Sequence, residues 1–342
     1  MHNLLKLYLC ILDITFCPKS ARGGYYPSFL QIIRFIAHKT AQKGALDMDD
    51  RIYSDLALES NYAMRSNLGA ADGYSETERD GFKICRLDIS SDELSAKYKR
   101  APGSYITVIC GQIWGLPEKS FISLSSLIGG EIRKMLEDIT NKKINRDFSV
   151  LAVGLGNAEI TPDSIGPLTV SKLTVTRHIG AISRDIFNKL GQCSVSALAP
   201  GVLAQTGIEA LEIIRGAVER TSPDAVIAVD ALAARSCDRL GSTVQISDSG
   251  ITPGSGIGNL RSAINQENLG VPVIAIGVPT VVDSSTLVYD ALEKAGIESP
   301  PSLREILDNG RGFFVSPKES DIISESVSLL LSRALDEAFC VI

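Results

Sequence analysis

Phe148-Ser-Val-Leu-Ala-Val-Gly-Leu-Gly-Asn157 and Asp224-Ala-Val-Ile-Ala-Val-Asp230 are the two short apolar runs that indicate the fold most clearly. Both consist mainly of Val, Ile, Leu and Ala and are bounded by turn-forming residues, a pattern typical of strands buried on both faces of a parallel sheet. The first run leads into Thr161-Pro162-Asp163, and the second ends on Asp230. Ligands of open parallel sheets collect outside the carboxyl ends of the strands, so we expect both aspartates at one functional edge.

Strand and helix patterns alternate along the rest of the chain. Apolar residues at helical spacing predict helices at 120–139, 207–219, 232–240, 285–296 and 318–338. Alternating or continuous apolar runs predict further strands at 82–89, 105–110, 243–247 and 271–277, the first of them near an edge of the sheet. This order predicts an α/β fold with a doubly wound, mostly parallel sheet and helices on both faces.

The composition is that of an ordinary globular protein. Of the 342 residues, 44% are apolar and 22% charged, and the formal net charge is -6. No basic patch indicates direct nucleic-acid binding, and no segment indicates a membrane partner. The seven cysteines include no Cys-x-x-Cys pair, which favours reduced cytosolic thiols over a disulfide framework or a zinc site. We expect no cofactor.

Asp163 and Asp230 are the candidate catalytic residues. Each could instead cap a helix or turn, since Asp is favoured at both positions, and Asp230 is expected to end its strand just before the helix at 232–240. If the two carboxyl groups face each other, both cannot ionise cheaply, and one pKa rises above the usual value of about 3.9. One group then acts as a base toward water and the other as an acid toward the leaving group. The sequence does not assign the two roles, because a coupled pair titrates as a unit.

The Gly-rich segment 245–259 is the candidate substrate-binding element. Gly254, Ser255 and Gly256 would allow the backbone to approach a bound chain closely, and Asp248 supplies a third carboxylate at the same edge. The segment has neither the full G-x-G-x-x-G register nor a Walker lysine. A non-catalytic module that binds a nucleotide or phosphate through this loop is the competing hypothesis from another class.

His178 gives a second alternative. It is the only histidine outside the first forty residues, and with Asp163 and Asp230 it could hold one metal ion through nitrogen and oxygen ligands. A hydrogen-bonded structural role at a strand end is the simpler interpretation of a lone histidine.

Residues 1–47 differ in character from the rest of the chain. The apolar segment 3–17 is interrupted by Lys6 and Asp13 and is shorter than the roughly 20 residues of a membrane helix. It also lacks a well-formed basic region and cleavage site of a signal peptide. We interpret residues 1–47 as an extension outside the working unit, with Met48 as the true translation start.

Several longer motifs occur together and in order. They are Gly154-Leu-Gly-Asn157, Thr161-Pro-Asp163, Asp230-Ala-Leu-Ala-Ala-Arg-Ser236, Gln245-Ile-Ser-Asp-Ser-Gly250, Pro253-Gly-Ser-Gly-Ile-Gly-Asn259 and Val273-Ile-Ala-Ile-Gly-Val-Pro-Thr-Val-Val-Asp283. In this combination the chain, from about Met48 to its C-terminus, resembles the germination proteases of spore-forming Firmicutes. The resemblance implies an endopeptidase of unusual aspartic type whose catalytic residues match Asp163 and Asp230, with a fold similar to that of hydrogenase-maturation proteases.

The resemblance also implies substrates, assembly and processing. Members of the family degrade small acid-soluble spore proteins during germination, which implies a cytoplasmic location in the spore core, and they are homotetramers made as zymogens. They cut after an acidic residue followed by an aliphatic residue, Ala, any residue and Glu, and Ser54-Asp-Leu-Ala-Leu-Glu59 has this form. We therefore expect autoprocessing between Asp55 and Leu56, so that residues 48–55 form a propeptide and 56–342 the protease domain. Ser-Asp is also a cap signal, and a plain strand or helix start is the alternative for this segment.

Overall fold

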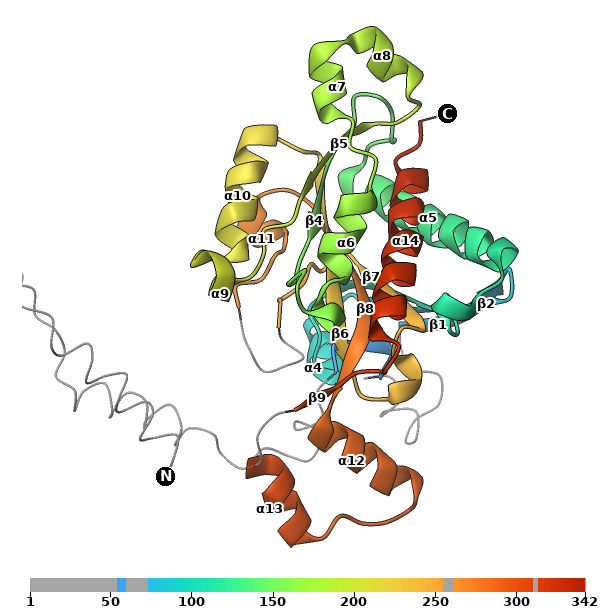
Figure 1. The fold of residues 1–342 in the computed structure, drawn as a ribbon, viewed down its shortest axis with the longest axis vertical. Coiled ribbons are helices and arrows are strands. Elements are labelled where there is room, and N and C mark those ends of the chain that lie inside the picture. Colours follow the sequence, from blue (N-terminus) through green and yellow to red (C-terminus); the bar gives the residue numbers. More distant parts are fainter. Residues whose placement is uncertain (1–53, 60–72, 255–260, 310–312, 342) are drawn as a thin grey trace, which may run out of the picture. The chain divides into compact units, whose positions relative to one another are not determined.

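The computed structural model describes residues 54–59, 73–254, 261–309 and 313–341 (Figure 1). The predictions for residues 1–47, for a start at Met48 and for most of the propeptide therefore fall outside the described residues. Among those that are described, no helix combines the length and apolar character needed to cross a bilayer.

A single mixed sheet forms the centre of the described chain, with its strands in the order β1-β2-β3-β7-β8-β6-β4-β5 and β9 added beside β8. Parallel pairing joins the four apolar strands β4 (Ser149–Gly154), β5 (Ser194–Leu198), β6 (Ala225–Ala234) and β8 (Val273–Asp283). Antiparallel pairing adds β1 (Tyr74–Arg79), β2 (Phe82–Ile89), β3 (Gly103–Ile109), β7 (Thr243–Ser247) and β9 (Phe314–Val315). The predicted edge position of segment 82–89 is confirmed, because only β1 lies outside β2.

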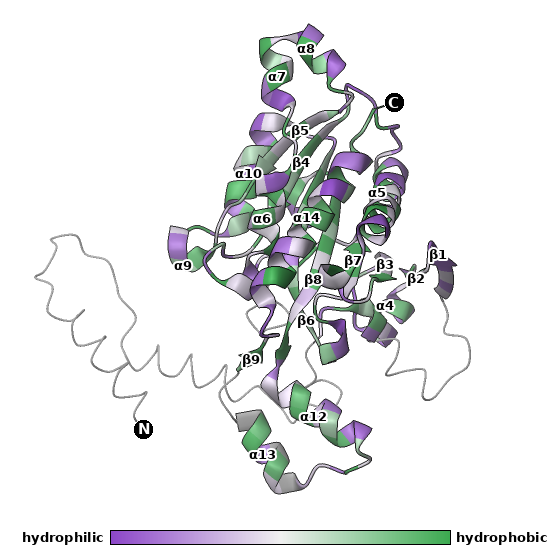
Figure 2. Ribbon diagram, turned by 45° about the vertical axis from the view of Figure 1, so that its right-hand side comes forward, coloured by the Kyte–Doolittle hydropathy of each residue, from purple (hydrophilic) through white to green (hydrophobic). Residues whose placement is uncertain are grey.

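Helices cover both faces of this sheet, as predicted for an α/β fold (Figure 1). One face packs against α5 (Glu118–Thr140), α6 (Ile165–Lys172) and α14 (Ser320–Ala338), whose apolar residues share a core with alternate residues of the strands. The other face packs against α10 (Ala210–Thr221) and α11 (Gln266–Leu269). In Figure 2 the hydrophobic residues concentrate in the parallel strands and the helix surfaces beside them, whereas edge strand β1 is hydrophilic.

The remaining helices lie at the margins of these layers. They are α4 (Asp92–Tyr98), α7 (Arg177–Ile182), α8 (Arg184–Lys189), α9 (Leu203–Thr206), α12 (Ser284–Lys294) and α13 (Pro301–Asn309). Three short 3₁₀ turns are η2 (Ile113–Gly115), η3 (Thr161–Asp163) and η4 (Cys237–Arg239). Of these, α4 matters for the site, because its Tyr98 shares a small core with Ala57 and Tyr105.

The predicted helix at 232–240 is wrong. Strand β6 continues through Ala234, since the backbone of residues 231–234 pairs with residues 278–282 of β8 across an irregularity in the register. Only η4 follows it. An Ala-rich stretch suits a helix by propensity, but here the neighbouring strand satisfies its backbone groups and tertiary pairing overrides the local preference.

Candidate active site

Asp230 lies inside strand β6 and not at its end, which corrects the expectation that it precedes a helix. Its partner on β8 is Gly277, and the strand continues for four more residues. The side chain is 6% exposed, and its Oδ1 accepts a hydrogen bond from the N–H of Ala231 at 2.9 Å. A carboxyl group buried in this way is not a helix cap, so its placement needs another explanation.

Asp163 reaches the same region from the turn that follows β4. It is the last residue of η3, and its Oδ2 accepts the N–H of Asn157 at 2.7 Å. Only glycine fits at position 156. Its φ is +106°, and a Cβ there would lie 2.1 Å from the carbonyl oxygen of Asp163. The Gly-rich end of the first apolar run thus serves to bring the Asp163 turn against the strand.

The two aspartates have different electrostatic environments. Burial raises the pKa of Asp230 well above its ordinary value, and the nearby charge of Asp163 raises this pKa further, while the N–H of Ala231 opposes the shift. Burial also raises the pKa of Asp163, but the N–H of Asn157 and the positive charge of Arg261 lower it. Asp230 therefore keeps its proton to a higher pH than Asp163, as an acid–base pair requires.

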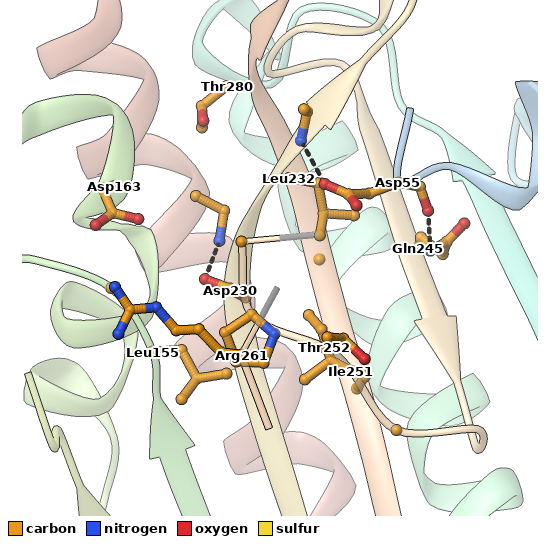
Figure 3. A pocket seen from close by; sticks show the side chains of 18 of the residues that line it. Asp55, Leu155, Asp163, Asp230, Leu232, Gln245, Ile251, Thr252, Arg261 and Thr280 are labelled. Carbon is orange, nitrogen blue, oxygen red and sulfur yellow. Dashed lines mark hydrogen bonds between the residues drawn. The ribbon is translucent and has the colours of Figure 1, made fainter. Parts of the chain in front are cut away.

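A cavity of about 820 Å³ connects these groups. Its lining includes Asp163, Asp230, Arg261, Gln245 and Asp55, which come from widely separated parts of the sequence (Figure 3). Apolar side chains and backbone form much of the remaining wall. A large cavity with a few converging polar groups is the usual form of a site for a bound peptide or small molecule.

Asp55 brings its own chain segment to this cavity. The N–H of Asp55 donates to the carbonyl of Ala233 at 2.9 Å, and the N–H of Ala233 donates back to Asp55 Oδ2 at 2.9 Å. On the other side, Gln245 Nε2 donates to the carbonyl of Asp55 at 3.2 Å and Gln245 Oε1 accepts from the N–H of Ala57 at 2.7 Å. The segment is therefore bonded to both β6 and β7, the two strands that flank β8 in the sheet.

Side chains fix the same segment further. Arg100 Nη2 donates to the carbonyl of Ser54 at 2.6 Å and to that of Leu56 at 3.3 Å. The Leu56 side chain is fully buried in an apolar cluster with Leu232, two residues beyond Asp230 on β6. The bond between Asp55 and Leu56 is thus held in a defined place and does not lie on a free surface.

Glu59 is held by backbone donors. Its carboxylate accepts the N–H groups of Arg235 at 2.7 Å and Ser236 at 3.0 Å, just after the end of β6. Two successive N–H groups on one carboxylate make a small anion-binding site. Glu59, the last residue of the predicted recognition sequence, is therefore bound by the backbone that follows β6.

The other predicted site residues have mixed outcomes. Gly254 lines the cavity, whereas Ser255 and Gly256 lie outside the described residues. Asp248 is absent from the cavity lining; its Oδ1 accepts the N–H of Ser104 at 2.7 Å and so ties β7 to the start of β3. Because β7 runs antiparallel to β8, its carboxyl end lies away from the carboxyl ends of the parallel strands.

His178 is not brought to the aspartates. It lies exposed on α7, next to the start of β5 and outside the cavity lining. Within the described parts of the chain, no group of three or more His, Cys, Asp or Glu residues could hold a metal ion. The proposed metal-ligand set of Asp163, Asp230 and His178 is therefore not assembled.

The described cysteines are free, and three of them are buried. Burial raises the pKa of Cys110 to about 12 and that of Cys193 to about 12, so both thiols stay protonated and unreactive. This agrees with reduced structural cysteines.

Gln245, Arg100 and Arg261 contribute to the site although none of them is predicted from the sequence as a site residue, and only Gln245 lies in one of the motifs quoted above. For Gln245 a signal exists, since Thr243, Gln245 and Ser247 alternate with the apolar Val244 and Ile246 along β7 and so mark a polar face. Nothing local distinguishes the two arginines from surface residues.

Comparison with known proteins points in one direction. The family model described as "Germination protease" matches residues 54–295. A germination protease from Caldanaerobacter subterraneus subsp. tengcongensis is 37% identical over 310 residues, which cover 84% of this chain and 94% of that protein. The germination protease of Bacillus subtilis is 42% identical over 261 residues, covering 74% of this chain and 69% of that protein.

Among solved structures, the chain resembles the crystal structure of a NiFe hydrogenase maturation protease, HycI, from Thermococcus kodakarensis. The TM-score is 0.32 at 19% identity, over 59% of this chain and 98% of that one. This likeness is too distant to indicate shared chemistry.

Proposed function

The chain belongs to the germination protease family, and on this basis we propose that it cleaves peptide bonds by acid–base catalysis with Asp163 and Asp230. Because it belongs to this family, the chain is an endopeptidase of spore germination. The single observation that carries the mechanism is the pair of carboxyl groups that line one cavity with unequal environments, since Asp230 is buried whereas Asp163 is partly exposed and lies near the positive charge of Arg261.

The unequal environments suggest one assignment of roles. Asp163, the more readily ionised, takes a proton from a water molecule as the water oxygen bonds to the carbonyl carbon. Asp230 gives its proton to the leaving nitrogen as the C–N bond breaks, which leaves a carboxylic acid and an amine. After one turnover Asp163 carries the proton taken from water and Asp230 has lost its own. Asp163 releases a proton to solvent and Asp230 takes one up, which restores the starting state of the pair.

We propose that the chain is made as a zymogen and cleaves itself between Asp55 and Leu56. In support, Asp55 lines the cavity that holds both aspartates, and the flanking residues are bonded on each side. Cleavage at this bond is further supported by the sequence of the segment, which has the family's acidic–aliphatic–Ala–x–Glu form.

The natural substrates, by resemblance to the family, are small acid-soluble spore proteins in the cytoplasm of the spore core. The assembly expected on the same ground is a homotetramer, which sedimentation velocity of the purified chain would test.

The mechanism is tested by mutation of each aspartate. Wild type, Asp163→Asn, Asp230→Asn and a control at the exposed helix residue Asp138, Asp138→Asn, are incubated with a small acid-soluble spore protein, and the cut sites are identified by mass spectrometry. We expect loss of activity by about 10²–10⁴-fold in the two site variants, the usual contribution of a general acid or base. Activity of both site variants near wild type would refute the mechanism.

A chelator separates this mechanism from the metal-dependent alternative. We expect the wild-type enzyme to cut with equal rate after dialysis against EDTA. Loss of activity with EDTA, restored by a divalent metal, would replace the two-aspartate mechanism.

A further inference from the structure

Gln245 holds both sides of the peptide bond that is proposed to be cut. Its Nε2 donates to the carbonyl oxygen of Asp55 at 3.2 Å, and its Oε1 accepts from the N–H of Ala57 at 2.7 Å. We infer that Gln245 is a further catalytic residue, which donates a hydrogen bond to the scissile carbonyl and stabilises the negative charge that develops on its oxygen. The inference rests on the proposed cleavage between Asp55 and Leu56.

The orientation of the Gln245 amide follows from its partners. A carbonyl oxygen can only accept a hydrogen bond and a backbone N–H can only donate one. Turning the amide over would place oxygen against oxygen at Asp55 and nitrogen against nitrogen at Ala57. The donor of Gln245 therefore faces the oxygen of the bond to be broken.

The sheet register places Gln245 and Asp230 on opposite sides of one glycine. Gly277 of β8 pairs with Asp230 on β6 and with Gln245 on β7, so the three residues form one row across the sheet. Residues directly opposite one another point to the same face, and two strand spacings separate the outer Cα atoms by about 10 Å. A polar donor and an acidic group thus flank a position that carries no side chain.

Leu232 fills part of the space that Gly277 leaves. A Cβ at Gly277 would lie 2.3 Å from Leu232 Cδ1, and Leu232 packs with Leu56, the residue after the scissile carbonyl. Because residue 277 has no side chain, Leu232 can lie over it and contact Leu56, and this apolar contact holds the segment of Leu56 next to Gln245.

This geometry suits the chemistry of amide hydrolysis. When the water oxygen bonds to the carbonyl carbon of Asp55, the π electron pair moves to the carbonyl oxygen. The N–H of Gln245 already points at that oxygen, and it gives up no proton in the step. Collapse of this intermediate expels the Leu56 nitrogen, which is protonated by Asp230. A fixed donor in a buried site stabilises such an oxyanion more than it stabilises the neutral carbonyl.

Autoprocessing of the full-length chain tests the inference. The first-order rate of cleavage between Asp55 and Leu56 is measured by mass spectrometry in wild type, Gln245→Glu, Gln245→Leu and the exposed-site control Gln112→Glu. Gln245→Glu removes the donor to Asp55 but keeps an acceptor for the N–H of Ala57. Hydrogen exchange of the amides of residues 57–59 reports in the same samples whether the segment remains docked.

We expect Gln245→Glu to keep the exchange protection of residues 57–59 while its cleavage rate falls about 10²–10³-fold, the usual effect of losing one oxyanion donor. Gln245→Leu should be at least as slow, and Gln112→Glu should match wild type. A docked but slow variant is a result that a purely structural tether would not produce.

Three results would overturn the inference. If both Gln245 variants cleave at the wild-type rate while Asp163→Asn and Asp230→Asn are inactive, the inference fails and the proposed mechanism stands. If the rate falls only in proportion to lost exchange protection, Gln245 is a tether. If the wild-type chain is not cut between Asp55 and Leu56, the proposed processing site fails and the role of Gln245 fails with it.

Discussion

At the scale of single residues, Asp163 is positioned by the backbone around it. Its carboxylate accepts the N–H of Asn157, and its carbonyl oxygen lies where a side chain on Gly156 would have to be. A second glycine, Gly166, allows the following helix an equally close approach, since a Cβ there would lie 2.2 Å from the carbonyl oxygen of Leu155. Small residues on both sides therefore determine where the carboxyl group of Asp163 can lie.

Gly156→Ala should disturb this arrangement. The positive φ alone costs about 1–3 kcal/mol in a residue with a side chain, and the clash with Asp163 adds to it. We expect lower stability toward urea and a loss of peptidase activity of about 10²-fold, the scale for a small misplacement of a catalytic group. The matched control is Gly207→Ala, where φ is +71° but a Cβ meets nothing within 4 Å. Equal activity in both variants would contradict the positioning role.

The raised pKa of Asp230 predicts how stability depends on pH. A carboxyl group whose pKa is raised by folding contributes stability below its unfolded value of about 3.9, and this contribution is lost as the pH rises through the folded-state pKa. Asp230→Asn removes this cost of ionisation. We expect the variant to resemble wild type in urea denaturation at pH 4 and to be more stable than wild type at pH 8. Parallel stability curves for the two proteins would show that Asp230 ionises normally.

At the scale of elements, the length of β6 shapes the site. Because the strand runs on to Ala234, its buried part beyond Asp230 offers the backbone of Ala233 to Asp55, and the N–H groups that follow the strand bind Glu59. A helix beginning at 232 would have turned these backbone groups inward to its own hydrogen bonds. The extension of one strand thus places Asp230 inside the strand and provides the backbone groups that bind Asp55 and Glu59.

The packing of α5 against α14 gives an element-scale prediction. A Cβ at Gly129 of α5 would lie 2.7 Å from the carbonyl oxygen of Ala334 on α14, whereas one at the neighbouring Gly130 meets nothing within 4 Å. Gly129→Ala should force the helices apart and destabilise the fold by about 1–3 kcal/mol. Gly130→Ala should stabilise it by about 0.5–1 kcal/mol, because glycine is unfavourable inside a helix. Urea denaturation of the pair measures the difference, and equal effects would show that the helices are not in close contact.

At the scale of the whole described chain, the site lies where the two halves of the sheet meet. Asp163 and Asp230 come with the parallel strands β4 and β6, and Gln245 comes with the antiparallel strand β7. Strand β8 joins the halves, with parallel pairing to β6 and antiparallel pairing to β7. Because the pairing direction changes across β8, the parallel strands bring carboxyl groups to the cavity and the antiparallel strand β7 brings the amide of Gln245.

The domain division predicts the result of a truncation. The family match begins at residue 54, so a chain that begins at Met48 should keep the unfolding free energy of the full chain within about 0.5 kcal/mol, as for changes away from buried contacts. It should also cleave itself at the same bond. A large loss of stability or of processing in the 48–342 chain would show that residues 1–47 belong to the working unit.

Local patterns in the amino-acid sequence were enough to predict several parts of this protein. Continuous apolar runs marked β4 and the first half of β6, helical spacing marked α5 and α14, and both runs pointed to Asp163 and Asp230. Each of these signals lies within a short window, where the periodicity of burial follows directly from strand or helix geometry. The α/β fold follows from their order.

The remaining features depend on tertiary contacts. Residues 231–234 became strand because β8 pairs with them, and the unequal pKa shifts of Asp163 and Asp230 depend on burial by elements distant in sequence. Gln245 meets Asp55 across 190 positions of the chain. Burial, strand pairing and contacts between distant segments are set by the whole fold, so no local pattern could specify them.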